Sequence, residues 1–436
     1  MHTSAFDMRC LATRMARICS SLVLLLGVGA SFASASEEVK KTDVTYAKDV
    51  SRIVQERCQT CHHKGTAAPF SLITYEDVKR KAKGIRDAVS DNRMPPWHAD
   101  PHFNKFSNDR RLSADQKQKL LAWIDGGCVL GDEKDLPAPA EYADGWVIGK
   151  PDVIFEMPKE QTVQAEGVVD YQYFVTKTNF KEDVWVQAAE ARPGNRAVVH
   201  HIIVFFRDPK KPRGGQGDGL GQNMIVGTAP GDMPQIFKPG VARKIPAGAE
   251  LVWQMHYTPT GKVEKDRSQV GFIFYKGKEP PAHAAITQGI ANMDLLIPAG
   301  APNQKFESNW TLRQDAVIFS FMPHMHVRGK DFEYKAIYPN GKSEILLSVP
   351  KFDFNWQTMY RLETPMRLPK GTRIHCTAHY DNSAKNPANP DPTKEVSWGD
   401  QTWEEMLIGW VDYYLENPEK SSAAAPNADE PKELKK

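Results

Sequence analysis

Few features of this 436-residue sequence point to a nucleic acid or a membrane. Basic and acidic residues nearly balance, and a net charge of +2 excludes the strong positive field that nucleic-acid binding needs. After the first 35 residues no apolar run is long enough to span a bilayer, so we expect no stable membrane insertion. No tandem repeat stands out, and helical periodicity is scarce after residue 130. The composition therefore favours β-sandwiches for the larger part of the chain.

Cysteine is also scarce, with six residues in the whole chain. Two of them lie in the N-terminal leader, and Cys58 and Cys61 belong to a motif of their own. Only Cys128 and Cys376 remain. The sequence leaves open whether these two form a disulfide or stay as buried thiols.

The N-terminus has the pattern of a secretory signal peptide. Basic residues precede the apolar stretch from Ile18 to Ala30, and Ala33-Ser34-Ala35 fits the small-residue cleavage pattern. We expect residues 1–35 to be removed and the mature chain to be periplasmic or secreted by a bacterium. An uncleaved membrane anchor is the alternative, but the apolar run is short for a span.

A C-x-x-C-H motif at Cys58, Cys61 and His62 predicts a covalently bound haem c. The two thiols would form thioethers to the haem, and the imidazole would bind the iron. A zinc site would need a second Cys/His pair nearby. Helices predicted over residues 44–57 and 75–89, and a third opened by the capping box Ser113–Gln116, would surround the haem.

Met94 is the predicted sixth ligand of the haem iron, because the prolines after it stiffen a loop that presents the sulfur. Its loop resembles the distal-methionine loop of bacterial cytochrome c domains. His63, His98 and His102 are alternative ligands, and an open sixth position is another.

Five histidines lie in three apolar, strand-like segments, and solvated surface histidines do not have this pattern. They are His200, His201, His256, His324 and His326. A buried imidazole needs a partner for its nitrogens, and a metal ion supplies one. His324 and His326 are two apart, so on a strand they face the same side. His200 and His201 are adjacent, so they share a metal only if the backbone deviates from a regular strand.

From Trp146 to Tyr414 the chain resembles the copper type II ascorbate-dependent monooxygenases. Four motifs occur in the order of that family: Val199-His200-His201, Gln254-Met255-His256-Tyr257, Pro323-His324-Met325-His326 and Glu404-Glu405-Met406-Leu407. The resemblance implies two antiparallel β-sandwich domains with two coppers facing each other across a solvent-filled cleft.

The resemblance also assigns the ligands. His200, His201 and His256 would bind one copper, and His324, His326 and Met406 would bind the copper at which oxygen reacts. Imidazole suits both common oxidation states of copper, and a thioether favours Cu(I). Met255, Met322 and Met325 are alternative sulfurs, and a core position is the ordinary role of a methionine such as Met406. His375 and His379 are interpreted as structural, and His283 carries no signal.

Two departures from the family bear on the substrate. Met322 stands where the peptide-hydroxylating members have an arginine, and Trp410 stands where they have a tyrosine. The contacts to a peptide carboxylate are therefore expected to be missing.

A further departure concerns a cysteine. Leu407 stands where members of the family commonly have a cysteine, so Cys376 lacks that partner.

The predicted fold is a small all-α cytochrome c-like domain followed by two all-β, jelly-roll-like copper domains. The predicted limits are a signal peptide at 1–35, a haem domain at 36–130, a linker at 131–145, copper-binding sandwiches at 146–280 and 281–416, and a disordered tail at 417–436.

The leading functional hypothesis is an exported copper monooxygenase that hydroxylates a C–H bond of a small organic substrate with O2. The fused haem would relay electrons, first to the copper of His200, His201 and His256, and an external donor is a further expected partner. The alternative is a non-catalytic haem and copper protein that transfers electrons or holds copper. Zinc would tolerate the histidines but gains little from Met406.

Overall fold

A computed structural model describes residues 43–64, 66, 68–142, 145–210, 223–228 and 234–416 of the chain. Within these ranges, helices occur only in the part before residue 136. The predicted signal peptide and the predicted disordered tail lie outside these residues. Within the described ranges, no helix combines the length and the apolarity needed to cross a bilayer.

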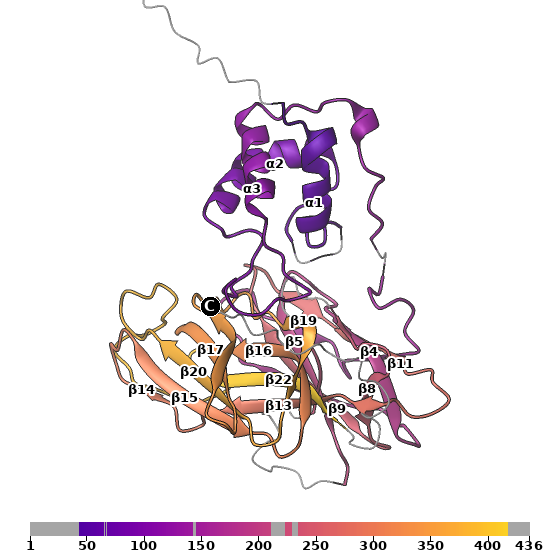
Figure 1. Ribbon diagram of the computed structural model, residues 1–436, viewed down its shortest axis with the longest axis vertical. Helices are drawn as coiled ribbons and strands as arrows, with labels where there is room; N and C mark the ends of the chain where they lie inside the picture. The colour runs from indigo at the N-terminus through magenta and orange to yellow at the C-terminus, as the bar shows by residue number, and fades with distance from the viewer. Residues whose placement is uncertain are drawn as a thin grey trace, which may run out of the picture. The chain divides into compact units, whose positions relative to one another are not determined.

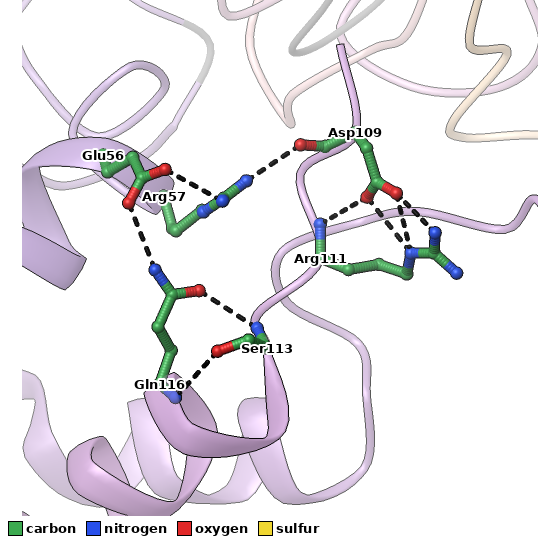
Figure 2. A network of polar contacts seen from close by, with 6 residues as sticks. All are labelled: Glu56, Arg57, Asp109, Arg111, Ser113 and Gln116. Atoms are coloured by element: carbon green, nitrogen blue, oxygen red, sulfur yellow. Dashed lines mark hydrogen bonds and ion pairs between the residues drawn. The ribbon is translucent and has the colours of Figure 1, made fainter. Parts of the chain in front are cut away.

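The helical elements are the π-helical turn Tyr46–Val50, α1 (Ser51–Arg57), α2 (Tyr75–Ser90), α3 (Ala114–Asp125) and the 3-10 turn Glu133–Asp135. The predicted capping box at the start of α3 is confirmed. Ser113 Oγ accepts from the backbone N–H of Gln116 at 3.1 Å, and Gln116 Oε1 accepts from the backbone N–H of Ser113 at 3.0 Å (Figure 2). Each residue therefore satisfies a backbone donor that the helix start leaves unpaired.

The helices, drawn in indigo to magenta in Figure 1, share one hydrophobic cluster. Its buried members are Tyr46, Val50, Val54, Leu72, Val78, Ala82, Val89, Leu120, Trp123 and Cys128. Cys376 belongs to a different cluster, in the second β-sandwich, and both cysteines are free thiols. Three helices around such a cluster do not by themselves define a cytochrome c fold.

The rest of the described chain is β-structure, and its first half holds twelve strands. They are β1 (Val153–Glu156), β2 (Gln161–Val163), β3 (Gln172–Lys177), β4 (Val184–Arg192), β5 (Val199–Arg207), β6 (Met224–Thr228), β7 (Gln235–Ile236), β8 (Val241–Ile245), β9 (Glu250–Tyr257), β10 (Glu264–Asp266), β11 (Gln269–Phe274) and β12 (His283–Ala284). The sheet β1-β11-β4-β8-β12, joined by β7, and the sheet β3-β9-β5-β6 enclose the first core, while β2 pairs with β10.

The second half holds ten strands. They are β13 (Ile286–Ala291), β14 (Leu296–Ile297), β15 (Gln304–Thr311), β16 (Ala316–His324), β17 (Gly329–Ile337), β18 (Ser343–Val349), β19 (Tyr360–Leu368), β20 (Arg373–Tyr380), β21 (Val396–Ser397) and β22 (Ile408–Leu415). The sheets β13-β22-β16-β19 and β15-β20-β17-β18 enclose the second core, and β14 pairs with β21. All named pairs are antiparallel except β8 with β12. The predicted all-β character of this part is thus confirmed.

Burial along the strands explains which faces meet. In β20 buried residues alternate with less buried ones, as expected of a strand that covers a core with one face. In β16 nearly every residue is buried, and in β5 the residues His201 to Val204 are buried without alternation, because both faces are covered there. The histidines lie at the ends of these strands and of β9, where the sandwiches meet.

Two buried contacts hold the sandwiches together. An apolar cluster contains Ile203 and Met224 from the first half and Met406 from the second. Arg243 on β8 reaches into the second half, where its Nη2 donates to Thr287 Oγ1 at 2.8 Å and lies 3.5 Å from Asp412 Oδ1. Breaking a buried charge pair by removing one partner is costly, so this pair opposes separation of the two halves.

Candidate metal centre

The first histidine group comes from the neighbouring strands β5 and β9. His201 lies opposite His256 in the antiparallel register, whereas the register shifts between Val199 and His201. His200 is therefore the extra residue of a β-bulge, where two residues of one strand face one residue of its partner. A regular strand would turn the two adjacent imidazoles to opposite faces, and the bulge removes that obstacle.

The three imidazoles of this group converge. Ligand nitrogens of His200, His201 and His256 all lie within 4.8 Å of one another, and the Nδ1 atoms of His200 and His201 are 3.4 Å apart. The buried atoms His201 Nε2 and His256 Nδ1 have no hydrogen-bond partner in the protein. Leaving such atoms unpaired costs free energy, which coordination of a metal ion would offset. The donor set therefore fits one metal ion.

Electrostatics favours the neutral, metal-binding form of these imidazoles. Burial lowers the pKa of His256 to about 3, and the neighbouring His200 contributes to this shift. Burial also lowers the pKa of His201 well below its ordinary value, and the charges of the other four histidines act in the same direction. Because His324 and His326 contribute to that shift, the two histidine groups are close enough to influence each other.

The second group forms where β16 ends. His324 is the last residue of β16, and His326 follows two residues later, outside the strand. A turn therefore directs His326, rather than the strand alternation that the spacing predicts. The two rings are nevertheless perpendicular neighbours, with centroids 5.2 Å apart. Met406 precedes β22, whose first residue Ile408 is the register partner of His324.

Hydrogen bonds fix the tautomers of these two imidazoles. Gln357 Oε1 accepts from His324 Nδ1, and the carbonyl oxygen of Glu404 lies 3.0 Å from His326 Nδ1. With a proton on each Nδ1, each Nε2 carries the lone pair that a metal needs. His326 Nε2 is buried and has no partner in the protein.

Glu405 fixes the backbone between the histidine turn and Met406. Its Oε2 accepts from the N–H of His326 at 2.8 Å, and its Oε1 accepts from the N–H of Arg328 at 2.6 Å. Burial raises the pKa of Glu405 to about 8, although these hydrogen bonds favour the charged form. Burial also lowers the pKa of His324 to about 4 and that of His326 to about 3. The second group thus combines neutral imidazoles with a constrained backbone.

Two aromatic residues that the sequence did not single out lie between the groups. The Tyr171 ring is 5.3 Å from that of His201, 4.8 Å from that of His256 and 6.4 Å from that of His326. Tyr171 is only 7% exposed, so a buried ring lies where the resemblance implies a solvent-filled cleft. Phe354 contacts both groups as well. Neither aromatic residue belongs to a motif, so no local signal could have found them.

The candidate sulfur ligands separate into different surroundings. Met406 and Met322 belong to one buried cluster between the sandwiches, together with Met224, Met359 and Trp410. Met325 is buried in the core of the second sandwich, and Met255 is buried in the core of the first. Core packing is therefore the observed role of Met325 and Met255.

The C-x-x-C-H motif follows α1 directly. His62 Nδ1 lies 3.1 Å from the carbonyl oxygen of Phe70, and this contact leaves Nε2 available for a metal. Burial raises the pKa of the Cys58 thiol to about 12. The motif residues fit the attachment of a haem, and Met94, which is partly buried, stays a predicted ligand.

The remaining histidines have ordinary partners. His63 stacks on Tyr142 with ring centroids 4.2 Å apart, and His102 Nδ1 is 2.6 Å from a carboxylate oxygen of Asp100. For His98, the nearby carboxylate of Asp353 partly offsets the lowering of its pKa by burial.

The histidines interpreted as structural lie away from both groups. His375 and His379 on β20 lie 3.3 Å and 2.6 Å from carboxylate oxygens of Glu307 and Asp331. His283 stacks on Tyr414 with ring centroids 4.2 Å apart.

Comparison with protein families matches residues 292–434 to the copper type II ascorbate-dependent monooxygenase, C-terminal domain. The matched range covers about a third of the chain and includes His324, His326 and Met406. The match supports copper as the metal and an oxidoreductase of the monooxygenase class.

Other comparisons add no functional information. No curated protein sequence matches the chain. Among solved structures, the infectious bursal disease virus VP2 subviral particle is 9% identical and covers 63% of this chain and 83% of its own, with a TM-score of 0.15. The major capsid protein of bacteriophage PM2 is 8% identical and covers 59% of this chain and 97% of its own, with a TM-score of 0.23. Scores this low carry no argument about this chain.

Proposed function

We propose that this protein is a copper-dependent monooxygenase that hydroxylates a C–H bond of a small organic substrate with O2. The observation that carries the proposal is the set of buried ring nitrogens without a partner in both histidine groups, namely His201 Nε2, His256 Nδ1 and His326 Nε2. Imidazole is a ligand that suits copper in both common oxidation states. The family match over residues 292–434 supports the same metal.

The two histidine groups would each bind one copper. His200, His201 and His256 would hold one copper, and His324, His326 and Met406 would hold the other. Copper bound at these groups would supply oxygen activation and two one-electron transfers, so that O2, two electrons, two protons and R–H yield R–OH and water. Gln357 and Glu404 keep the Nδ1 protons of His324 and His326 in place, and Met406 offers a soft sulfur that favours the reduced metal.

The substrate is proposed to carry less charge than a peptide with a free carboxylate. Met322 and Trp410 are register partners on β16 and β22, and both are buried in the apolar cluster that contains Met406. A carboxylate buried against this surface would have no cation to pair with at either position. We therefore expect poor hydroxylation of peptides that end in glycine.

A haem c is proposed on Cys58, Cys61 and His62, with Met94 as the sixth ligand. Such a haem would supply one-electron transfer, and its attachment to the same chain would raise the local concentration of the donor. We propose that electrons pass from it to the copper groups, first to His200, His201 and His256, and that an external donor reduces it. Attachment in a bacterial periplasm agrees with the signal peptide predicted at residues 1–35.

One observation favours a second candidate function, a non-catalytic protein that transfers electrons or holds copper. His324 and His326 are 3% and 0% exposed, and Met406 is 8% exposed. An oxygenase needs an open position beside its metal, whereas a carrier is served well by buried ligands. The burial of these three predicted ligands therefore favours the second candidate function.

Metal analysis followed by isotope labelling separates the candidates. The full-length mature protein should bind two equivalents of copper, consume O2 with a small reductant, and transfer one atom of 18O2 to a compound in a panel of small organic substrates. Two bound coppers without oxygen consumption would favour the carrier. No bound copper would overturn both.

A further inference from the structure

The loop between β18 and β19, residues 350–359, contacts both histidine groups. Phe354 in this loop stacks on His200, with ring centroids 5.5 Å apart and planes 14° from parallel. The same ring lies 6.0 Å from the ring of His256 and 6.1 Å from that of His326. One side chain from the second sandwich therefore touches predicted ligands of both metals.

Two further side chains of this loop contact histidines of the two groups. Gln357, which is 4% exposed, accepts from His324 Nδ1. Asn355 also acts on His200, where it partly offsets the lowering of the imidazole pKa by burial. Together with Phe354, these contacts reach four of the five histidines, so the position of the loop matters to both groups.

The end of the loop is held by a segment from far upstream, residues 97–108. Asn108 Nδ2 donates to the carbonyl oxygen of Met359 at 2.7 Å, and Asn108 Oδ1 accepts from the N–H of Arg361 at 3.0 Å. A single asparagine thus satisfies backbone groups on both sides of Tyr360. Met359 itself belongs to the apolar cluster that contains Met406.

The upstream segment is part of the second core. Trp97 and Phe106 pack on Tyr360, with ring centroids 5.0 Å and 5.6 Å away, and both are less than a tenth exposed. Phe106 also forms an antiparallel bridge with Leu362 at the start of β19. Aromatic contacts of this kind stabilise a fixed arrangement, so the segment is an integral part of this sandwich.

The other end of the segment is tied to the helices. Asp109 directly follows Asn108, and its carbonyl oxygen accepts from Arg57 Nη1 at 2.9 Å (Figure 2). Arg57 is the last residue of α1 and directly precedes Cys58. Gln116 at the start of α3 joins the same network through Glu56, at 3.1 Å. A continuous series of contacts therefore runs from the C-x-x-C-H motif to the loop at the histidines.

We propose that Phe354 is a positioning residue for both histidine groups, and that residues 97–108 hold its loop in place and so couple the helical region to the metal centre. The bulge at His200 leaves that imidazole without a regular strand position, and the stacked ring of Phe354 fixes its plane. The proposal rests on the proposed copper function, and it concerns the geometry of the ligands rather than the reaction.

Phe354→Leu tests the first part, with Phe354→Tyr as the conservative variant and Phe352→Leu as the matched control. Phe352 lies in the same loop but is buried in the second core. Phe354→Leu should change the Cu(II) EPR spectrum and weaken copper binding about tenfold, the lower range for residues that orient ligands. Phe354→Tyr should restore both, and Phe352→Leu should lower the melting temperature without changing the spectrum. Equal spectra for wild type and Phe354→Leu would overturn the proposal.

Asn108→Asp and Asn104→Asp test the second part as a matched pair. Each amide donates to a backbone carbonyl at 2.7 Å, that of Met359 for Asn108 and that of Leu346 for Asn104. Both variants should lower the melting temperature, and only Asn108→Asp should change the Cu(II) spectrum. A Cu(II) spectrum of Asn108→Asp that equals that of the wild type would refute coupling through this segment.

A metal-independent measurement separates this inference from the copper function. In the metal-free protein, Phe354→Leu should shift the imidazole NMR signals of His200, His256 and His326 and leave that of His379 unchanged. Unchanged imidazole signals would overturn the positioning role whatever the wild type binds. Shifted signals in a protein that binds no copper would overturn the copper function alone.

Discussion

The two histidine groups reach similar arrangements by different means. In the first group the backbone conformation brings the ligands together, because a bulge at His200 turns two adjacent imidazoles toward His256. In the second group hydrogen bonds from the two imidazoles to oxygen atoms of Gln357 and Glu404 fix the tautomers. The first group has three imidazoles in contact, whereas the second has two neighbouring imidazoles, with the thioether of Met406 as its predicted third ligand.

This difference indicates which group tolerates rearrangement. Ring nitrogens that are held by hydrogen bonds keep one orientation with or without a metal. In the first group the two Nδ1 atoms of His200 and His201 face each other, so a proton or a metal must lie between them or one ring must move. We therefore expect the first group to be the more adaptable of the two and the second to be preorganised.

Removing one imidazole from each group should have the largest effect. His326→Ala and His201→Ala should each remove about one equivalent of bound copper and abolish hydroxylation, because each eliminates a buried ligand. Copper content and single-turnover product measure this. His379→Ala is the control, since this histidine pairs with Asp331 on the other sheet of the second sandwich. Loss of both equivalents in one variant would show that the groups are not separate sites.

The change of folding stability with pH is expected to be the second largest effect. Three buried histidines, His256, His324 and His326, have pKa values of about 3 to 4 in the folded state. Their unfolded value is about 6.5, so below this pH the unfolded state binds more protons and folding is disfavoured. Each histidine then removes roughly 1.4 kcal/mol per pH unit until its folded pKa is reached.

Glu405, which belongs to the second group only, changes folding stability with pH in the opposite direction. Burial raises its folded pKa to about 8, so it favours folding at low pH and this contribution is lost as the pH rises through about 8. Denaturant unfolding of the metal-free protein should therefore show maximum stability near pH 6 to 7 and a steep loss toward about pH 4. Glu405→Gln should flatten the alkaline side and steepen the acid side above about pH 4.5, because this carboxyl binds a proton more tightly in the folded state over that whole range. A flat acid side would contradict neutral buried imidazoles.

The sequence predicted the elements that depend on local pattern. The helix starting at Tyr75, the capping box at Ser113 and the β-rich second part follow from caps and periodicity, and the structure confirms them. The convergence of His324 and His326 also follows from spacing, although a turn rather than the strand brings it about.

The features that the sequence did not predict depend on partners far away in the chain. A bulge at His200 changes pairing with β9 and leaves the apolar pattern of β5 intact, so periodicity cannot detect it. The ring contacts of Phe354 and Tyr171 with the histidines join residues that are at least 28 positions apart in the sequence. The contact of Asn108 with Met359 joins residues 251 positions apart, and no local rule can anticipate it.

Removing the hydrogen bond to His324 should affect the second group alone. Gln357→Leu leaves Nδ1 without an acceptor, and we expect copper affinity there to fall about 10- to 100-fold. Gln357→Glu keeps an acceptor and should restore affinity. Thr358→Ala, in the same loop, removes only a 3.4 Å contact to the carbonyl oxygen of Trp356 and serves as the control. Competition titrations with a chelator measure both groups, and an equal loss in the first group would contradict the distinction.

Exchanging the thioether for a methyl group should have the smallest effect and should depend on the oxidation state. Met406→Ala should weaken Cu(I) binding about tenfold and Cu(II) binding much less, because a soft sulfur favours the reduced ion. The first group has no sulfur among its predicted ligands and should not respond. Parallel Cu(I) and Cu(II) competition titrations give the two affinities.

Two methionines near Met406 provide the controls for that experiment. Met322→Ala removes a sulfur from the same apolar cluster, and Met325→Ala creates a cavity in the second core. Both should lower the melting temperature, since a buried methionine contributes about 2 to 5 kcal/mol to stability. Neither should change the ratio of Cu(I) to Cu(II) affinity. If Met322→Ala changes that ratio and Met406→Ala does not, Met322 is the ligand, and the second group is completed from β16 rather than from the residue before β22.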